Sequence, residues 1–441
     1  MENKIHDVVI VGGGVIGTAL MFVLSKYTNV KDVCLIEKAS DVGELVSNSK
    51  GNSQTLHFGD IETNYTLEKA TQVNECASLV AGFLHKFGEN ENLYKKFNKM
   101  VLAVGTEEIE VLEKRYAEFR KLFPRLKKIN RQEIAGMEPN VVLGRPQNEE
   151  IMALFSQDGY TVDYGALSKS FVKKSTNFEL KLKTELKLVS KEACEKNGEI
   201  YVLKTSQGVL RAKTVVFCLG GYSLLYAKSL GYGKEFSVLP IAGSFYHTKH
   251  LLNSKVYTLQ DPSLPFASVH GDPDLDHSDK TRFGPVAKVV FMLERGNYKS
   301  VSGFFRVFGV SWGAIVTLFK LMMNWKMFGF ILLQSLYGLP WIGKRLFLKD
   351  VRKIVPSVQA SDIEKAKGYG GVRPQIIDKN KRWLSFGTAR IVGKNAIFNV
   401  TPSPGASMCL ATALEDVKQV VEFLGAGYTF DEMAFRKDLT T

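Results

Sequence analysis

Hydrophobic positions near the beginning of the chain form two short uninterrupted runs with an amphipathic segment between them. The runs cover residues 7–11 and 32–36, and the segment Val15–Tyr27 has the length and apolar spacing of a helix. Short apolar runs without alternating polar residues are typical of strands that are buried on both faces. The pattern therefore predicts a strand, a helix and a second strand as the opening unit of an α/β domain.

Periodicity predicts further elements along the chain. Residues 107–126 have apolar positions at helical spacing with mixed charges between them, which predicts a solvated helix. Residues 181–213 alternate apolar and polar side chains around Asn197-Gly198, which predicts a hairpin. Two more strands and a last helix are expected at 214–219, Ala396–Val400 and Ala411–Leu424.

The composition is that of an ordinary globular protein, with 45% hydrophobic and 23% charged residues in 441. It excludes disordered, collagenous and coiled-coil classes, and the length predicts two or three domains. The five cysteines stand singly with no C-x-x-C pair, which argues against a disulfide framework and a zinc site, so we expect no metal. The first apolar run leads directly into a glycine-rich turn without a signal peptide before it, so a cytoplasmic protein is expected.

Positive charge is concentrated in one segment. The 58 Lys and Arg against 45 Asp and Glu give a net charge of +13, and residues 285–353 hold eleven of the basic and two of the acidic residues, or +9. The uncharged stretches 307–319 and 327–343 in this segment are shorter than the ~20 residues needed to span a bilayer. Two alternatives remain, namely helices at a membrane interface and buried helices with lysines at their edges. Three tryptophans accompany these stretches: Trp312, Trp325 and Trp341.

The turn after the first strand contains Gly12-Gly13-Gly14-Val15-Ile16-Gly17, which fits the G-x-G-x-x-G pattern. Gly12 permits the tight turn, Gly14 lets the backbone approach a pyrophosphate, and Gly17 lets the helix pack on the strand. Glu37 follows the second strand, 20 residues after Gly17. A carboxylate there accepts hydrogen bonds from ribose hydroxyls and disfavours a 2′-phosphate. The pattern predicts a dinucleotide site that takes NAD or FAD rather than NADP.

A second glycine-containing turn lies near the C-terminus. Residues 401–407 lead into the last predicted helix and supply another set of backbone N–H groups at a positive helix end. Placed against the pyrimidine ring of a flavin, that end would stabilise the negative charge of the reduced form. An ordinary Pro/Gly turn with a helix cap is the alternative.

Several stretches together carry a resemblance to known enzymes. They are GGGVIG with Glu37, SNSKGNSQTLHFGDIETNY (47–65), QDGYTVDYGAL (157–167), VVFCLGGYS (215–223), VLPIAGSFYH (238–247), FASVHGDPD (266–274), GVRPQIID (371–378) and TPSPGAS (401–407). The chain resembles the FAD-dependent oxidoreductases of the glycine oxidase and glycerol-3-phosphate dehydrogenase type. Within them it is similar to the 2-hydroxy-acid enzymes, namely malate:quinone oxidoreductase of the epsilonproteobacterial branch and L-2-hydroxyglutarate dehydrogenase.

The resemblance implies an α/β fold with a Rossmann-like FAD-binding domain of the glutathione-reductase type, as in glycine oxidase. It also implies an inserted α+β substrate domain built on an antiparallel sheet. The FAD-binding domain is expected at 1–85, 155–225 and 368–441, and the substrate domain at 86–154 and 226–367, with 285–353 facing the membrane or a quinone.

The resemblance also implies which residues bind the cofactor. In relatives the polar run 47–54 packs on the pyrophosphate and the isoalloxazine, whereas a solvated loop is its ordinary interpretation. No cysteine occupies an attachment position, so non-covalent FAD is expected. The FAD-binding residues implied are Gly12, Gly14, Val15, Ile16, Gly17, Glu37, Lys38, Asn48, Ser49, Asn52, Ser53, Gln54, Gly220, Pro404, Gly405, Ala406 and Ser407.

Substrates of this class are small carboxylates, and a guanidinium grips a carboxylate through two hydrogen bonds. Arg373 stands where relatives hold the substrate carboxylate. A second carboxylate requires another partner, for which Arg282, Gln375 and Tyr65 are candidates. Tyr246 is a further candidate for the lining of the substrate site.

Oxidation of a secondary alcohol requires a base for the hydroxyl proton, and histidine is the natural choice near neutral pH. We expect His270 to be this base, with His57 as the alternative base or as a residue that packs on the flavin. Asp272 would orient His270 only if the turn brings it back. A hydrogen-bonded core histidine is the structural alternative for both.

The function expected from the resemblance is FAD-dependent oxidation of L-malate to oxaloacetate with electrons passed to a quinone, at the inner face of the cytoplasmic membrane. No nucleic acid partner is expected, and the oligomeric state stays open. The alternatives are an L-2-hydroxyglutarate or L-lactate dehydrogenase, an amine or amino-acid oxidase on the same fold, and a non-enzymatic FAD-binding protein recruited to membranes.

Overall fold

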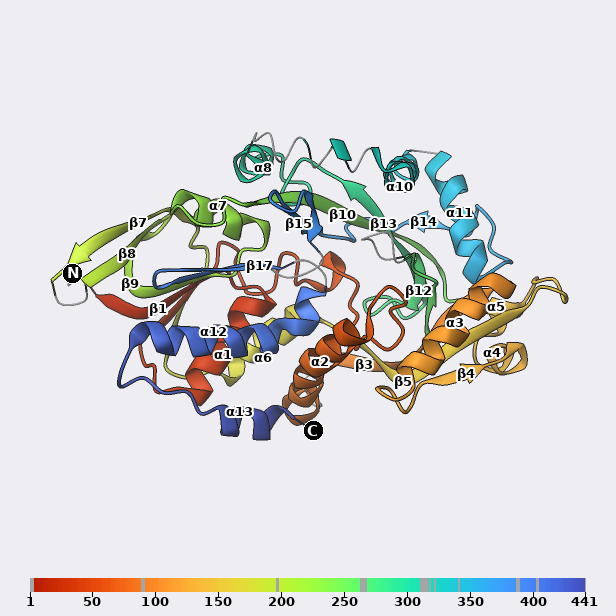
Figure 1. Ribbon diagram of the computed structural model, residues 1–441, viewed down its shortest axis with the longest axis horizontal. Helices are drawn as coiled ribbons and strands as arrows, with labels where there is room; N and C mark the ends of the chain where they lie inside the picture. Colours follow the sequence, from red (N-terminus) through yellow and green to blue (C-terminus); the bar gives the residue numbers. More distant parts are fainter. Residues whose placement is uncertain are drawn as a thin grey trace.

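The computed structural model describes residues 4–88, 92–195, 198–261, 268–309, 316, 319–320, 323–339, 342–385, 389–401 and 404–440. Its strands form two sheets that lie side by side along the long axis of the molecule (Figure 1). The predicted mixed α/β class is confirmed. All five cysteines are free thiols. Some predicted features lie outside the described residues: Asn197, Trp312, Trp341, Pro402 and Ser403.

The first sheet has eight strands, and five of them are parallel, in the order β18-β9-β1-β2-β6. β17 pairs β18 and the β7–β8 hairpin pairs β9, all antiparallel. The predicted hairpin and the predicted strands of this region are therefore confirmed. The strands are β1 (Ile5–Val11), β2 (Val33–Ile36), β6 (Phe178–Lys181), β7 (Leu186–Cys194), β8 (Gly198–Thr205), β9 (Gly208–Phe217), β17 (Ala389–Gly393) and β18 (Ala396–Val400).

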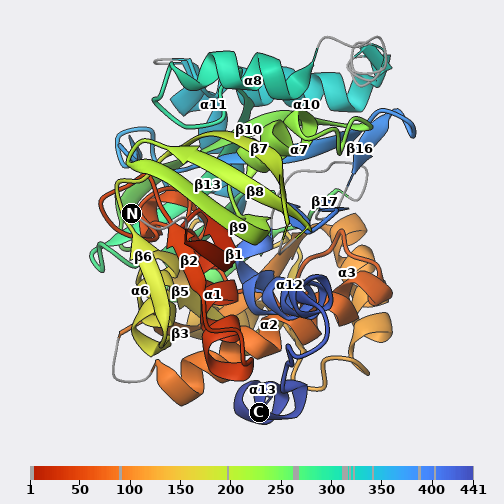
Figure 2. The same ribbon diagram turned by 90° about the vertical axis from the view of Figure 1, so that its left-hand side faces the viewer.

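Both faces of the parallel strands are buried, as their uninterrupted apolar runs predict. Val8 and Ile10 of β1 face one hydrophobic core, while Val9 and Val11 face the other. Figures 1 and 2 show one group of helices below the sheet and another above it. Those below are α1 (Val15–Tyr27), α2 (Leu67–Phe87), α6 (Tyr164–Lys174), α12 (Cys409–Leu424) and α13 (Glu432–Leu439), and those above are α7 (Gly221–Ser229) and α8 (Ser300–Phe308).

The second sheet has ten strands and is antiparallel except where β11 runs parallel to β3. Its order is β16-β15-β10-β13-β12-β11-β3-β5-β4, with β14 beside β10. The strands are β3 (Tyr94–Val104), β4 (Lys127–Ile129), β5 (Ile151–Val162), β10 (Phe236–Lys249), β11 (Lys255–Thr258), β12 (His270–Pro273), β13 (Lys280–Val289), β14 (Glu364–Lys365), β15 (Val372–Asp378) and β16 (Trp383–Ser385). β5 and β15 thus belong to this sheet, although most of each lies in a segment predicted for the FAD-binding domain.

Four helices accompany the outer strands of the second sheet. The helix predicted at 107–126 is α3 (Thr106–Phe119), which ends earlier than expected, and α4 (Arg131–Met137), α5 (Pro139–Val142) and α11 (Ile342–Ile354) follow. α11 buries Phe347 and Val351 against the sheet and turns its basic residues outward.

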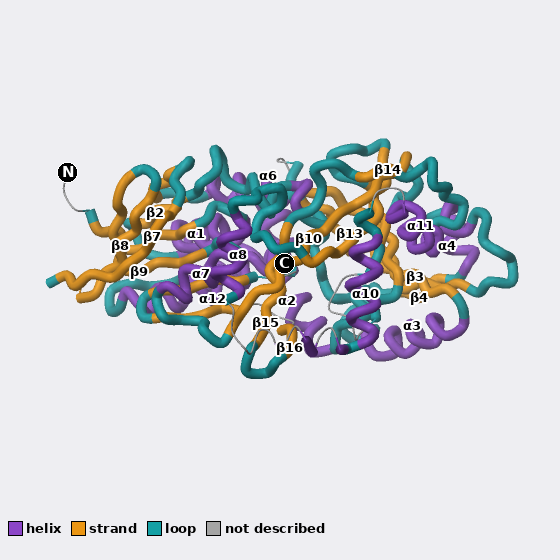
Figure 3. Tube along the Cα trace, turned by 90° about the horizontal axis from the view of Figure 1, so that it is seen from above, coloured by secondary structure: helices purple, strands orange, loops and turns teal. Residues whose placement is uncertain are grey.

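α10 (Trp325–Leu336) differs from the other long helices, because most of its apolar side chains are not buried. Only Met327 and Gln334 are buried, although the helix is mostly hydrophobic. α8, α10 and α11 follow one another along the upper side of the molecule (Figures 1 and 3). Within the described residues, no helix is both long and apolar enough to cross a bilayer.

Candidate active site

The turn between β1 and α1 has no room for side chains at Gly12 and Gly17. Gly12 has a φ of +109°, and a Cβ on it would lie 2.5 Å from the carbonyl oxygen of Cys218. A Cβ on Gly17 would lie 2.0 Å from the carbonyl oxygen of Gly12. Gly14 precedes α1 and has no side chain to cap it, the Val15 N–H donates to Ser47 Oγ at 3.0 Å, and the first turn of the helix holds no acidic residue. This helix end therefore suits the phosphates of a dinucleotide.

Glu37 lies at the end of β2 and is held by two backbone N–H groups. Its Oε2 accepts from Gly13 at 2.7 Å and its Oε1 from Ala39 at 2.8 Å. The carboxylate is thus fixed beside the glycine turn, where the ribose of a dinucleotide lies in this motif. Lys38 forms an ion pair with Glu294 and lies over the ring of Tyr222, 5.6 Å from its centroid.

The polar run 47–54 is organised mainly by its own hydrogen bonds. Asn52 Nδ2 donates to the carbonyl oxygens of Ser47 and Asn48 in the run and of Val46 just before it, at 2.9 to 3.2 Å. Asn48 accepts from Lys50 N, and Ser49 donates to Asp276. Gln54 differs, since its Oε1 is buried without a hydrogen-bond partner in the described chain. The Oε1 atom of Gln54 is therefore placed to accept a hydrogen bond from a ligand.

The C-terminal turn meets this loop directly. Gly405–Met408 form a 3-10 turn that continues into α12, again without a side-chain cap. Ser407 Oγ accepts from the backbone N–H of His57 at 3.0 Å. Gly220, with a φ of +55°, begins α7 beside β9. The two glycine turns and the polar run 47–54 therefore lie together, and their crowded glycines and positive helix N-termini fit FAD.

Charged side chains gather on one face of the second sheet. β12 places Asp272 opposite Arg282 and His270 opposite Tyr257. Asp272 Oδ2 accepts from Arg282 Nη2 at 2.8 Å and from Lys255 Nζ at 3.2 Å. The Asp272, Arg282 and Lys255 side chains are fully buried. Asp272 therefore pairs with two cations instead of orienting His270.

This face of the sheet is turned toward the polar loop. Arg282 Nη2 donates to the carbonyl oxygen of Ser53 at 2.9 Å, and Lys255 Nζ donates to Thr55 Oγ1 at 3.2 Å. The charged cluster of the second sheet thus contacts the loop of the first, next to the glycine turns. Lys255 has no sequence signal that could have predicted it, because its role depends on strand pairing.

Arg373 lies on the same face. Arg373 pairs with Ile241 of β10, and Arg282 pairs with His247 of the same strand. Ile241 and His247 are six residues apart and therefore point to the same side of the sheet, as do the two arginines opposite them. Burial, and then the charge of Arg282, lower the pKa of Arg373. Arg373 is partly buried, and within the described residues its guanidinium has no hydrogen bond or ion pair. A desolvated cation without a partner is suited to bind an anion.

His270 is buried and neutral. Its ring stacks on Tyr257 with centroids 4.7 Å apart, and its Nε2 is buried without a partner in the described chain. Burial, together with Arg282 and Lys255, lowers the pKa of His270 to about 4 against the opposing charge of Asp272.

His57 has a partner that the sequence did not indicate. Its Nδ1 lies 2.6 Å from Glu62 Oε1, and its side chain is 17% exposed. Glu62 is buried, and burial alone would raise the pKa of this carboxyl, but the hydrogen bond and charge of His57 outweigh burial and lower it to about 2. The signal available in the sequence was a carboxylate five residues after the histidine with Gly59 between them.

The other predicted substrate residues are divided between locations. Gln375 lies opposite Leu239 on β10, two residues from Arg373 and on the same face. Tyr65 lies beside Glu62, with its backbone N–H bonded to the Glu62 carbonyl. Tyr246 instead faces the other side of the sheet, where its ring stacks on Phe347 and its hydroxyl donates to the carbonyl oxygen of Tyr337. The prediction that Tyr246 lines the substrate site is therefore wrong, because alternate residues of a strand face opposite sides.

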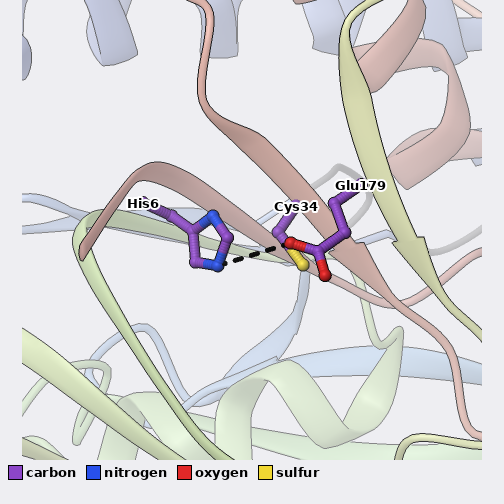
Figure 4. A group of neighbouring side chains, drawn as sticks. All are labelled: His6, Cys34 and Glu179. Carbon is purple, nitrogen blue, oxygen red and sulfur yellow. Dashed lines mark ion pairs between the residues drawn. The ribbon is translucent and has the colours of Figure 1, made fainter. Parts of the chain in front are cut away.

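One group of potential metal ligands occurs in the described part of the chain, formed by His6, Cys34 and Glu179 (Figure 4). His6 Nδ1 is 2.9 Å from Asp32, and Glu179 Oε1 is 2.6 Å from Lys181 Nζ. Burial raises the pKa of the Cys34 thiol to about 12, so the thiol stays protonated at neutral pH. Ion pairs within the protein account for this group, which lies at the opposite end of β1 from the glycine turn.

Comparison with known proteins agrees with this geometry. Residues 4–424 match the family model described as malate:quinone oxidoreductase (Mqo). A protein of Campylobacter jejuni, described as a probable malate:quinone oxidoreductase, is 42% identical over 98% of this chain and 99% of its own length.

Solved structures show the same fold at low sequence identity. L-α-glycerophosphate oxidase from Mycoplasma pneumoniae, determined with FAD bound, has a TM-score of 0.65 at 18% identity and covers 95% of each chain. Glycine oxidase from Geobacillus kaustophilus has a TM-score of 0.62 at 17% identity and covers 98% of this chain and 97% of its own. The predicted fold of FAD-dependent oxidoreductases is confirmed, and the chain belongs to the malate:quinone oxidoreductase family.

Proposed function

We propose that this protein oxidises L-malate to oxaloacetate with FAD and passes the electrons to a membrane quinone. The observation that carries the proposal is Arg373, whose desolvated guanidinium has no partner in the described chain. It lies on the face of the second sheet that contacts the polar run 47–54. Its fork matches a carboxylate, and the family match supplies malate as the carboxylate.

The charges around Arg373 favour an anionic substrate. Lys255, Arg282 and Arg373 lie on this face, and Asp272 and Asp274 are the acids closest to them among the described residues. Asp274 is in turn bonded to His247, 2.8 Å away. The excess of positive charge favours an anionic substrate, and the family match supports malate as that anion.

His57 is the base that takes the hydroxyl proton from C2 of malate. A base works best when its pKa lies near the operating pH, which disfavours His270 with a pKa of about 4. His57 has a carboxylate partner and lies next to the C-terminal turn. His270, expected from the sequence to be the base, then lines the substrate site as a neutral hydrogen-bonding group.

The bound FAD would accept the hydride from C2 and transfer the electrons to the quinone. The protein's part is to hold the malate carboxylate at Arg373, to receive the proton at His57 Nε2 and to exclude water with the buried sheet face. The residues proposed to hold FAD are those of the two glycine turns, Glu37 and the polar run 47–54. The experiment that tests the proposed reaction is anaerobic reduction of the flavin by L-malate.

The segment 285–353 attaches the enzyme to the inner face of the cytoplasmic membrane. Large apolar side chains are exposed along it, and Trp325 is 82% and Tyr298 79% exposed. Basic residues surround them, which suits an anionic leaflet. The exposed apolar residues of the segment are Phe291, Tyr298, Phe305, Phe319, Met323, Trp325, Leu332, Leu333, Leu339 and Ile342.

The double variant Met323→Glu/Trp325→Glu is expected to reduce binding to anionic liposomes at least about 100-fold, because each large apolar side chain contributes about 1.5–3 kcal/mol on burial. Co-flotation at low and high salt measures the effect. Met433→Glu is the matched control, since Met433 is 84% exposed on α13, on the opposite side of the molecule (Figure 1). Equal flotation of both variants and the native protein would contradict the attachment by this segment.

A further inference from the structure

The pair formed by His57 and Glu62 has a geometry that selects one ring nitrogen of the histidine. We propose that Glu62 is a positioning residue, which holds a proton on His57 Nδ1 and leaves Nε2 as the acceptor for the substrate proton. Their atoms Nδ1 and Oε1 are 2.6 Å apart. This inference rests on the proposed role of His57 as the base.

The backbone between the two residues is folded so that the side chains meet. Gly59 has a φ of +86°, and a Cβ on it would lie 2.9 Å from the Cα of Ala70. The chain turns there and is held beyond the turn by Arg115 of α3, whose Nη2 donates to the carbonyl oxygen of Glu62 at 2.6 Å. His57 is held from the other side by its N–H bond to Ser407. Both residues are therefore placed by the backbone and do not depend on their own contact.

The protonation state of Glu62 decides the tautomer. The hydrogen bond and charge of His57 outweigh burial and lower the pKa of Glu62 to about 2, so the carboxylate is ionised and can only accept a hydrogen bond. The proton of a neutral His57 must then reside on Nδ1, and the lone pair on Nε2 points away from Glu62. When Nε2 takes a proton from the substrate, the buried carboxylate stabilises the resulting imidazolium.

The other charged groups near His57 are engaged elsewhere, so Glu62 is the carboxylate that can hold the Nδ1 proton. Asp60 is the other buried acid of the loop, and it accepts from Lys99 Nζ at 2.6 Å. Lys99 also lies over the Phe58 ring, 5.0 Å from its centroid. Arg115 faces the Glu62 carbonyl oxygen, and its Nε is buried without a partner in the described chain. Among the described acids, Glu62 is the one in hydrogen-bond contact with the His57 ring.

Glu62→Gln is expected to slow anaerobic flavin reduction by malate about 10- to 100-fold, because its amide no longer stabilises the imidazolium and its NH₂ group can donate to Nδ1. The pH at which the reduction rate falls to half on the acid side is expected to move to lower pH, since the variant lacks the negative charge that favours protonation. A merely structural role for Glu62 would lower the rate equally at every pH.

Asp32→Asn is the matched control. His6 and Asp32 form a pair of the same kind, with Nδ1 2.9 Å from Oδ1, at the opposite end of β1 from the glycine turn. This variant is expected to keep both the reduction rate and its pH profile. Glu62→Asp, which restores the charge, is expected to recover part of the rate.

The ¹⁵N spectrum of the histidine rings reads the tautomer without any turnover, with His57→Gln identifying the signal. The native protein is expected to show the Nδ1–H tautomer for His57, and Glu62→Gln a mixture or the other tautomer. An unchanged spectrum and an unchanged pH profile in Glu62→Gln would overturn the inference.

A double-variant comparison separates this inference from the proposed function. If His57→Gln reduces its flavin slowly and the double variant His57→Gln/Glu62→Gln reduces it no more slowly, the two residues act as one unit. If His57→Gln reduces its flavin at the native rate, the proposed base is wrong. If His57→Gln is slow while Glu62→Gln is normal, only the role of Glu62 is wrong.

Discussion

Arg373→Ala is expected to lower kcat/KM for L-malate about 100- to 10,000-fold while the variant keeps its FAD. A guanidinium that grips a carboxylate through two charge-assisted hydrogen bonds contributes about 1.5–3 kcal/mol for each, and 1.4 kcal/mol corresponds to a factor of ten. The loss is expected mainly as a weaker malate affinity, because the contact proposed for Arg373 is with the carboxylate and not with the reacting C2 atom. Anaerobic stopped-flow reduction over a range of malate concentrations measures it.

Two further variants sharpen this result. Arg373→Lys keeps the charge but not the planar fork, so it is expected to recover only part of the affinity. Arg125→Ala is the control, since Arg125 is an exposed arginine whose ion pair with Asp158 lies at the surface. A native malate dependence in Arg373→Ala would show that the carboxylate binds elsewhere.

His57→Gln is expected to slow the reduction of the flavin by malate about 100- to 10,000-fold at saturating substrate, since this is the usual contribution of a general base. The affinity for malate is expected to change little, because the carboxylate contact at Arg373 is retained. Single-turnover reduction under anaerobic conditions gives the rate and the affinity separately.

His270→Gln is the comparison that decides between the two histidines. With its pKa lowered to about 4, His270 is neutral at pH 7, and its replacement is expected to affect malate affinity more than the rate of the chemical step. A large loss of rate in His270→Gln together with a native rate in His57→Gln would reverse the assignment.

Local patterns predicted the cofactor region well because its signals lie within short segments. The bounds of α1 and β18 agree with the prediction to the residue, and the glycine turn and Glu37 lie where the motif requires. A strand, a turn and a helix in sequence bring their own residues together, so no long-range pairing has to be known.

The substrate region could be predicted only in part. The role of Arg373 was expected from the resemblance and stays a prediction, whereas the Asp272 contacts with Arg282 and Lys255 depend on the order and register of β11, β12 and β13. Side-chain alternation makes each assignment sensitive to register, and the error at Tyr246 is of this kind. Glu62 was missed because only the turn at Gly59 brings it back to His57.

The segment 285–353 shows why hydrophobicity alone does not decide between core and surface. The apolar pattern of α8 and α10 fitted both buried and interfacial helices. α8 buries Phe304, Val307 and Phe308, whereas α10 buries only Met327 and Gln334. α8 packs on α7 and β10, whereas α10 packs on β13, and no periodicity within the segment reveals these contacts.

The most direct test of the proposed reaction is anaerobic bleaching of the flavin absorbance by single substrates. L-malate is expected to bleach the flavin completely and rapidly, L-2-hydroxyglutarate and L-lactate more slowly, and glycine, sarcosine and D-amino acids not at all, with a quinone restoring the colour. Bleaching by an amino acid but not by L-malate or the other hydroxy acids would contradict the account.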